Sequence, residues 1–331
     1  MNGMDDMIAR FPAQLTEALE IGEAASIKAH DKTIQNVFVA GLGGSGIGAE
    51  LVADMIRDEC KVPFLIGKGY DAPAYIDEHT LFIASSYSGN TEETLSCTDE
   101  IKGSGAKVVV ITSGGKLKAL AEQEGYDLIL LPNYWPSPRA CVGFSCVQQI
   151  YILYKLGLIT KVTINNLKTS IDLIKYDQEE IRSKAEKIAN ILYGKLPIIY
   201  TTDRMGSVAL RFKQQLNENA KIHSWYHVVP EMNHNELVAW CSKNNQIAVV
   251  FFRNKDDHKR NIMRIDVCKG ILAKCTDTII EIYSKGQSLA EKSIYFVHLG
   301  DWISWYLAQL RGVDAVEIGV IDHLKKELAK V

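Results

Sequence analysis

The sequence lacks the features that mark several specialised classes of protein. It has no run of about 18 apolar residues, so we expect no segment that crosses a membrane. No three basic residues are adjacent and the net charge is −3, so we expect no nucleic-acid-binding surface. The N-terminus is acidic and mixed, which is unlike a signal peptide.

The cysteines also lack an organising pattern. They number seven, an odd count, and contain no C-x-x-C pair. Such usage is typical of reduced, mostly buried thiols rather than of a disulfide framework or a cysteine-ligated metal. We therefore expect a cytoplasmic protein without a metal site built from cysteine.

What the sequence does contain is an alternation of short apolar segments with helical ones. At 331 residues the chain is long enough for two domains. Short apolar strands that alternate with helices predict a parallel, doubly wound α/β sheet. In the first half, strands are predicted at 36–40, 62–66, 81–84, 107–112 and 127–131.

The same alternation restarts after a Pro-rich turn at 132–139 and a predicted helix at 140–157. Helical segments separate the new strands, and a last helix is predicted at 320–330. We therefore predict two α/β domains, 1–155 and 156–331, the second a degenerate copy of the first. The strands of the second domain are predicted at 196–201, 246–252 and 278–283.

One turn of the first domain is rich in hydroxyl groups. Residues 85–91 place Ser86, Ser88 and Thr91 around Gly89 and Asn90. Backbone N–H groups in such a strand-to-helix turn converge on an anion, and the hydroxyls add donors. Since no Lys or Arg lies in this turn, it suits the phosphate of a small sugar phosphate. The alternative is a Ser-rich turn with Thr91 as a helix N-cap.

A second turn, Gly41 to Gly46, fits the pattern G-x-G-x-x-G between a strand and a helix. This is the context of a dinucleotide-binding fingerprint, which also needs a carboxylate at the end of the second strand. The sequence has Lys68 there and no acid until Asp71, which disfavours a dinucleotide. We instead expect a turn that lets a sugar approach the backbone, with Ser45 donating to a sugar hydroxyl.

The residues suited to proton transfer lie mainly in the second domain. Glu218 comes late on a predicted helix, and His234 lies in a loop bounded by Pro230. A carboxylate and a histidine can move protons at carbon and at a ring oxygen. Their ordinary interpretations are a solvated glutamate and a structural histidine. Arg139, where the first domain ends, could close over a ligand or pair with an acid.

Together these stretches resemble the bifunctional phosphoglucose/phosphomannose isomerase family of the sugar isomerase (SIS) fold. The hydroxyl-rich turn alone indicates an SIS phosphate loop, and its combination with P-x-P-R-A and N-H-N-E is more specific. The matching segments follow the family order across nearly the whole chain. They are GLGGSGIGAE (41–50), SSYSGNTEET (85–94), TSGG (112–115), PSPRA (136–140), NENAK (217–221), NHNE (233–236), GDWISWYLAQLRGVD (300–314) and IDHLKKEL (321–328).

The resemblance implies two SIS domains, each a three-layer α/β/α sandwich with a parallel sheet. It implies an aldose–ketose isomerase that acts on sugar 6-phosphates, without a cofactor or a metal, as a homodimer with shared active sites. Carried over by position, the phosphate is bound by Ser86, Ser88 and Thr91, the sugar site is lined by Gly44 and Ser45, and Arg139 stabilises the enediolate intermediate.

The remaining implied roles concern proton transfer. Glu218 is the base that moves the proton between C1 and C2, and His234, supplied by the partner subunit, assists ring opening. Lys325 matches the family's C-terminal lysine, another ring-opening residue, with Lys326 beside it as the alternative. The tail segment 312–322 lacks the Pro and Thr common in this family, so no residue is assigned to accommodating the mannose epimer.

Two other functions stay open on the sequence. A non-catalytic SIS module that senses sugar phosphates would keep the turn at 86–91 but would not need Glu218 together with His234. An isomerase for a different sugar phosphate, such as an aminosugar, would keep both. The residues are consistent with the glucose and mannose 6-phosphate isomerase, because an aldose–ketose shift needs a base near C1 and C2 and a cation near the enediolate.

Overall fold

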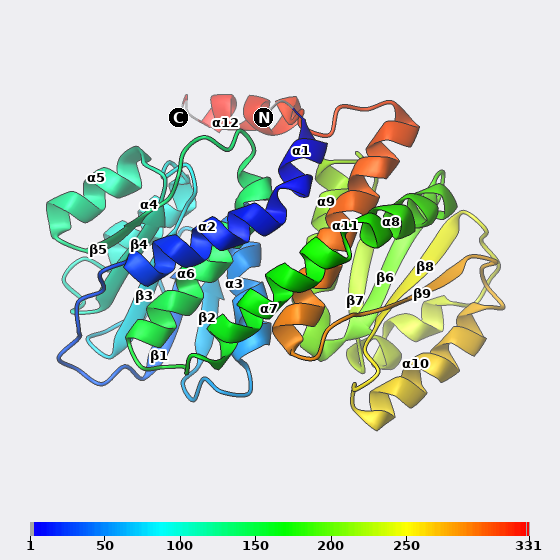
Figure 1. The fold of residues 1–331 in the computed structure, drawn as a ribbon, viewed down its shortest axis with the longest axis horizontal. Coiled ribbons are helices and arrows are strands. Elements are labelled where there is room, and N and C mark those ends of the chain that lie inside the picture. The colour runs from blue at the N-terminus through cyan, green and yellow to red at the C-terminus, as the bar shows by residue number, and fades with distance from the viewer. Residues whose placement is uncertain (1–2, 329, 331) are drawn as a thin grey trace. The chain divides into compact units, whose positions relative to one another are not determined.

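The computed structural model describes residues 3–328 and 330, and the chain forms two compact units. The first unit comprises Ala9–Tyr176 and Gly286–Ser293. The second comprises Asp177–Lys285 and the chain from Ile294, with most of the short helix α1 (Met4–Ala9). Each unit contains one sheet whose strands are all parallel (Figure 1). The predicted fold class, α/β with two parallel sheets, is confirmed.

The sheet of the first unit has five strands in the order β2-β1-β3-β4-β5. Its two central strands, β1 and β3, are almost entirely buried, as expected for a parallel sheet covered on both faces. The strands are β1 (Asn36–Ala40), β2 (Phe64–Gly67), β3 (Thr80–Ser85), β4 (Lys107–Thr112) and β5 (Asp127–Leu130).

Helices cover both faces of this sheet. Alternate strand residues point to opposite faces, and Phe38, Phe82 and Val110 pack with Cys97 of α4 and Leu117 of α5 on one of them. Helices α3 and α6 pack on each other and on the strands, and α2 and α7 pack against α6. The helical bounds are α2 (Phe11–Ala24), α3 (Gly43–Ile56), α4 (Glu92–Glu100), α5 (Gly115–Glu124), the 3-10 turn η1 (Pro138–Cys141), α6 (Val142–Lys155) and α7 (Val162–Tyr176).

The sheet of the second unit has four strands in the order β7-β6-β8-β9. Val249 and Phe251 of β8 pack with Ile265 of α10 on one face. On the other face Phe252 stacks on Phe296 of α11, with ring centroids 4.5 Å apart. The strands are β6 (Leu196–Thr202), β7 (Trp225–Val229), β8 (Ile247–Arg253) and β9 (Ile279–Tyr283).

The helices of the second unit complete the same layered arrangement around its sheet (Figure 1). Three of them, η2, η3 and η4, are short 3-10 turns. The bounds are α8 (Gln178–Leu192), η2 (Asp203–Met205), α9 (Gly206–Glu218), η3 (Glu231–His234), η4 (Glu236–Ala239), α10 (Lys259–Leu272), α11 (Leu289–Arg311) and α12 (Gly319–Leu328).

One α-helix, α7, and one strand, β7, were not predicted from the sequence. The helix α7 carries Ile164, Leu167, Ile171 and Ile174 on one buried stripe, a helical spacing that the sequence contains. The strand β7 is a short edge strand with mostly half-buried residues, so it lacks the apolar run that marks the others. A third difference is the start of α3 at Gly43, because the glycine turn forms the first turn of the helix.

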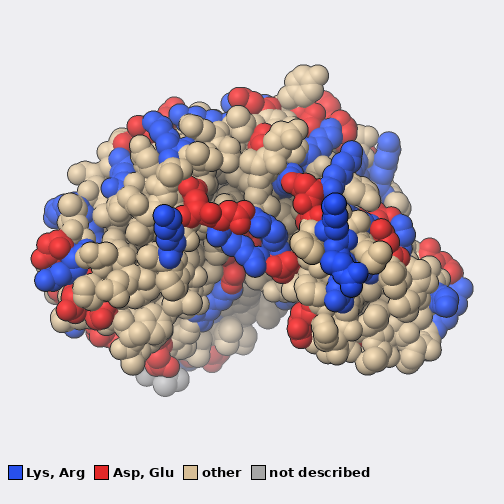
Figure 2. Space-filling model, turned by 90° about the horizontal axis from the view of Figure 1, so that it is seen from below, with Lys and Arg blue, Asp and Glu red and all other residues tan. Residues whose placement is uncertain are grey.

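The surface and the thiols match the composition. No helix within residues 3–328 and 330 has the length and apolar character that crossing a membrane requires. On the face drawn in Figure 2, Lys and Arg are interspersed with Asp and Glu. All seven cysteines lie in the described residues and are free thiols, and five of them are buried.

Candidate active site

The predicted ligand-binding residues of the first unit gather at one edge of its sheet. Because β1, β3 and β4 are parallel and in register, the turns after them lie side by side at their carboxyl ends. Ligands bind at this edge in open α/β sheets. The glycine turn with Gly44 and Ser45 follows β1, and the phosphate loop, defined as Ser86–Thr91, follows β3. The structure therefore brings these predicted residues together.

The phosphate loop is held in shape by its own hydroxyls and by a glycine. The Ser86 and Thr91 hydroxyls are 2.8 Å apart, and the Gly89 N–H donates to Ser86 Oγ over 3.1 Å. Gly89 has φ +67°, and a Cβ there would lie 2.7 Å from Thr112 Oγ1 and closer still to the Gly114 carbonyl oxygen. Only glycine meets both conditions, so this position is fixed by the close approach of the turn after β4.

Thr91 occupies the N-cap position of α4, as the sequence indicates, but its side chain does not cap the helix. Its hydroxyl instead contacts Ser86 within the loop. The first turn of α4 therefore keeps backbone N–H groups directed at the loop, where an anion is stabilised by the helix dipole. Ser88 is exposed, so its hydroxyl is accessible to a ligand.

Arg139 lies at the same edge, in η1, and its side chain is only 5% exposed. A Cβ on Gly44 would lie 2.8 Å from the Pro138 carbonyl oxygen and 3.6 Å from Arg139 Cα, so the glycine turn and the arginine segment are in contact. Gln14 of α2 anchors the far side of this segment. It donates to the Ala140 carbonyl oxygen over 2.8 Å and accepts from the Gly143 N–H over 3.0 Å.

Glu218 is the last residue of α9 in the second unit, late on the helix as predicted. Its neighbours hold it in place from both sides. Asn219 Nδ2 donates to Ser304 Oγ of α11 over 2.9 Å, and Asn217 Nδ2 donates to the Ile222 carbonyl oxygen over 2.7 Å. The carboxylate is thus carried on a helix end whose backbone is fixed by buried hydrogen bonds.

Lys221 links this helix end to the C-terminal tail. Its Nζ donates to the carbonyl oxygens of Glu218 and Glu317, each over 2.6 Å. Lys221 has φ +56°, an unusual conformation for a residue with a side chain. Glu317 lies two residues before α12, which carries Lys325 and Lys326, both exposed. The structure therefore connects the segment of Glu218 with the segment that leads to Lys325.

His234 is exposed on η3, and its neighbours are anchored while it is not. Asn233 Nδ2 donates to Cys268 Sγ over 2.9 Å, and Asn235 Nδ2 donates to Glu231 Oε1 over 2.8 Å. The His234 side chain makes no hydrogen bond within the described part of the chain. The loop thus presents its histidine to solvent from an ordered backbone.

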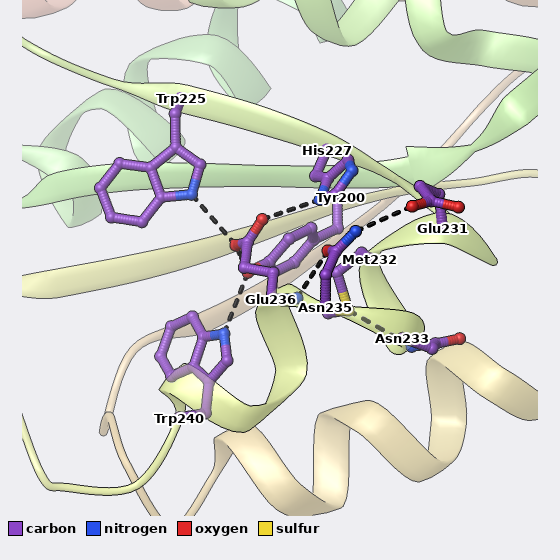
Figure 3. A network of polar contacts seen from close by, with 9 residues as sticks. All are labelled: Tyr200, Trp225, His227, Glu231, Met232, Asn233, Asn235, Glu236 and Trp240. Carbon is purple, nitrogen blue, oxygen red and sulfur yellow. Dashed lines mark hydrogen bonds and ion pairs between the residues drawn. The ribbon is translucent and has the colours of Figure 1, made fainter.

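A polar network that the sequence did not suggest supports this loop (Figure 3). The Glu236 carboxylate accepts hydrogen bonds from the Tyr200 hydroxyl, from Trp225 Nε1 over 3.1 Å and from His227 Nδ1 over 2.9 Å. Trp240 Nε1 in turn donates to the Tyr200 hydroxyl over 3.0 Å. The only sequence signal was the place of Glu236 in the N-H-N-E segment.

The Tyr200 phenol is a stable hydrogen-bond donor in this network. Burial first, and the Glu236 carboxylate second, raise the pKa of Tyr200 well above its usual value, so the phenol remains a donor at neutral pH. Glu236 directly follows the loop, and its own N–H donates to Asn235 Oδ1 over 2.6 Å. Its side chain thereby ties the His234 loop to β6 and β7.

Glu218 and His234 come from the two segments that flank β7. The chain passes from β6 through α9 to the parallel strand β7, so the end of α9 lies at the amino end of β7. The His234 loop follows the carboxyl end of β7, and Trp225, the first residue of β7, donates to Glu236, two residues after His234.

The features of a dinucleotide site are not completed here. β2 ends at Gly67, and Lys68 directly after it pairs with Glu50 over 2.6 Å, so a cation stands where the fingerprint needs an acid for the ribose. Among residues 3–328 and 330, no three His, Cys, Asp or Glu side chains are grouped closely enough to hold a metal ion.

Two parallel α/β units with a hydroxyl-rich loop at a carboxyl edge define a protein of the SIS class. The C-terminal domain of glucosamine-fructose-6-phosphate aminotransferase from Francisella tularensis has the same fold, with a TM-score of 0.76 at 15% identity over 96% of this chain and 99% of that chain. Residues 181–328 match the family described as bacterial phospho-glucose isomerase C-terminal SIS domain.

The whole chain is 38% identical to the bifunctional phosphoglucose/phosphomannose isomerase of Caldicellulosiruptor bescii, over 99% of both chains. It is also 34% identical to a D-glucosamine-6-phosphate 4-epimerase of Sulfolobus acidocaldarius, over 68% of this chain and 71% of that one. The chain belongs to the bifunctional phosphoglucose/phosphomannose isomerase family, and this confirms the family predicted from its motifs.

Proposed function

We propose that this protein interconverts glucose 6-phosphate and mannose 6-phosphate with fructose 6-phosphate. The observation that carries the proposal is the carboxyl edge of the first sheet, where the phosphate loop, Gly44 and Arg139 lie together in a chain that resembles a bifunctional isomerase over its full length. A phosphate, a sugar and a developing anion each have a matching group there.

Binding rests on the first unit. The phosphate oxygens accept hydrogen bonds from the Ser86, Ser88 and Thr91 hydroxyls and from N–H groups at the start of α4. Gly44, in contact with the Pro138–Arg139 backbone, and Ser45 line the sugar site beside this loop. The Arg139 guanidinium balances the negative charge that develops on the C1 and C2 oxygens of the enediolate.

Proton transfer rests on the second unit. Glu218 removes the C2 proton of the open-chain aldose, and the electron pair forms the C1–C2 double bond of the enediolate. The protonated Glu218 returns the proton to C1, while the C2 oxygen becomes the ketone. His234 and Lys325 assist the preceding ring opening by moving a proton from the C1 hydroxyl to the ring oxygen.

We also propose a homodimer in which His234 enters the active site of the partner subunit. The exposure of His234 supports this arrangement, since a second copy of the chain can reach a side chain at the surface. The exposed, well-supported His234 loop suits a side chain that acts outside its own unit. The domains we assign are 1–155 for phosphate binding and 156–331 for proton transfer, and the free thiols suit a cytoplasmic protein.

A second candidate function is the conversion of a different sugar phosphate. It is favoured by the 34% identity to the protein named D-glucosamine-6-phosphate 4-epimerase. That function would keep the phosphate loop and would change the carbon at which a proton or a hydroxyl is moved. Glucosamine 6-phosphate therefore belongs among the substrates tested.

The test is a turnover assay on chelator-treated protein. Formation of fructose 6-phosphate from glucose 6-phosphate and from mannose 6-phosphate is followed for the wild type and for Glu218→Gln. Turnover of both by the wild type, lost in the variant, is the expected result. If only glucosamine 6-phosphate is converted, the second candidate replaces the first. If sugar phosphates bind and none is converted, the protein is a sensor.

A further inference from the structure

Tyr87 lies inside the phosphate loop, and its side chain contacts the segment that follows β5. Its carbonyl oxygen accepts two hydrogen bonds from Ser113, from the N–H over 2.9 Å and from Oγ over 2.6 Å. Tyr87 therefore fastens the loop after β3 to the turn after β4. Its side chain is half-buried, so it has a second set of contacts beneath the surface.

The Tyr87 phenol reaches the segment that follows β5. Its hydroxyl donates to the Pro132 carbonyl oxygen over 2.8 Å and accepts from the Trp135 N–H over 3.3 Å. Burial first, and the nearby Cys141 thiol second, raise the pKa of Tyr87 far above its usual value. The phenol stays protonated at neutral pH and keeps donating to this segment.

The same segment continues to Arg139 through a short and conformationally restricted span. Trp135 is 4% exposed and packs edge-on against Phe144 of α6, with ring centroids 6.2 Å apart. Only three residues separate Trp135 from Arg139, and two of them are Pro136 and Pro138. Proline fixes its own φ, so a shift of Trp135 is passed along this span rather than absorbed by it.

We infer, on the basis of the proposed function, that Tyr87 is a positioning residue that sets the place of Arg139 relative to the phosphate loop. The phosphate and the C1–C2 pair are two ends of one substrate molecule. Arg139 must therefore stand at a fixed distance from the loop that holds the other end, and misplacement by an ångström lowers the rate steeply. Through Tyr87 the loop that binds the phosphate also holds the segment that carries the arginine.

The direct test is Tyr87→Phe, which keeps the ring and removes the hydroxyl. We expect kcat for glucose 6-phosphate to fall about tenfold, because one hydrogen bond to the arginine segment is lost and Arg139 shifts. The inhibition constant of inorganic phosphate, a competitor that occupies only the loop, should stay within about twofold of the wild-type value. Tyr126→Phe is the matched control, since its phenol lies near the α5–β5 turn and away from the site.

A double-mutant cycle separates positioning from general support of the fold. In an Arg139→Ala background, Tyr87→Phe should lower kcat by less than about twofold, because the group whose place it sets is gone. Pro136→Gly is an independent variant, since Pro136 is exposed and its loss relaxes the span without touching the Tyr87 hydrogen bonds. We expect it to lower kcat while phosphate inhibition is retained.

The opposite results overturn the inference. If Tyr87→Phe weakens phosphate inhibition as much as it lowers kcat, or if its effect simply multiplies with that of Arg139→Ala, Tyr87 supports the loop alone. A wild-type kcat in both Tyr87→Phe and Pro136→Gly would also overturn the inference, because neither the hydrogen bond nor the proline would then influence the place of Arg139. If the wild type binds phosphate but does not isomerise sugar phosphates, the proposed function fails first and the inference fails with it.

Discussion

The two units share a parallel α/β topology and differ in what they place at their edges. The first unit gathers small and hydroxyl residues, such as Gly44, Ser86 and Thr91, at one carboxyl edge. The second unit carries Glu218 at the amino edge of β7 and His234 at its carboxyl edge. The difference shows that the same fold can supply an anion site built from neutral groups in one unit and acid–base residues before and after a strand in the other unit.

The two units also differ in the residues that adopt a positive φ in their turns. In the phosphate loop of the first unit, the position with positive φ is a glycine, and its neighbours would block any side chain. In the second unit, Lys221 adopts φ +56° and is held by hydrogen bonds to the Glu218 and Glu317 carbonyl oxygens. A close approach of backbones requires glycine, whereas Lys221 keeps its side chain at positive φ with hydrogen bonds to two carbonyl oxygens.

The largest effect should come from the carboxylate of the second unit. We expect Glu218→Gln to lower kcat by about 10³-fold, because the variant cannot accept the C2 proton. Inhibition by inorganic phosphate should remain, since the phosphate loop lies in the first unit. Glu179→Gln, at an exposed position on α8, is the control and should leave both quantities unchanged. Comparable kcat for Glu218→Gln and Glu179→Gln would remove Glu218 from the mechanism.

The next largest effect should come from a substitution in the phosphate loop of the first unit. We expect Gly89→Ala to abolish measurable phosphate inhibition and to destabilise the protein by about 1–3 kcal/mol, because a Cβ at φ +67° collides with the turn after β4. Phosphate titration and urea unfolding give the two quantities. Gly125→Ala, at φ +70° but with open space around its Cβ, is the control for backbone conformation alone. Equal effects of the two substitutions would show that the close approach is unimportant.

A smaller effect should come from the network behind His234. Glu236→Gln places an amide NH2 group among donors from Tyr200, Trp225 and His227, so one of these contacts is lost. We expect about a tenfold loss of kcat with unchanged phosphate inhibition. Tyr200→Phe, which removes one donor to Glu236, should act in the same direction. A loss confined to thermal stability, with kcat intact, would assign the network to folding alone.

The smallest effect concerns the pH dependence of the free energy of unfolding, and it should arise from a histidine of the second unit. Burial in α11 lowers the pKa of His298 to about 3 from 6.5, and Trp302 Nε1 donates to its Nε2 over 3.3 Å. Between these two values the unfolded chain binds a proton at this site and the folded chain does not. Stability therefore falls as pH drops below 6.5, by up to about 1.4 kcal/mol per pH unit.

Urea unfolding at pH 7.5, 6.5 and 5.5 checks this dependence. His298→Gln should flatten the loss of stability on acidification, while His323→Gln, at a largely exposed position, should not. Well above pH 6.5 neither state of His298 binds a proton, so the contribution of His298 to the slope should vanish there. An unchanged slope in His298→Gln would mean that other groups set the acid stability of the second unit.

The fold could be predicted largely from apolar strands and the turns between them. The strands β1, β3 and β4 are each short, largely buried and followed by a helix, a pattern visible in the residues themselves. β7 was not predicted from the sequence because an edge strand with half-buried residues carries no apolar run. The phosphate loop, Gly44 and Arg139 could be foreseen because strand ends in a parallel sheet converge.

What could not be foreseen depends on contacts between distant segments. Tyr87 meets Pro132 across 45 residues, and Glu236 meets Tyr200 across 36. The alternative role of the Thr91 hydroxyl, a cap on α4, is not what the structure shows, because this hydroxyl contacts Ser86. Sequence spacing reveals which residues share a turn or a strand end, whereas side-chain partners across the fold follow only from the packed structure.

The most direct measurement is complementation between two inactive variants, Glu218→Gln and His234→Ala. If each active site takes Glu218 from one subunit and His234 from its partner, a mixed dimer has one intact site. Co-refolded variants in equal amounts should then recover about a quarter of the wild-type activity. If both residues act within one subunit, no mixed site is complete and the activity stays at the mean of the two variants, which would contradict the shared site.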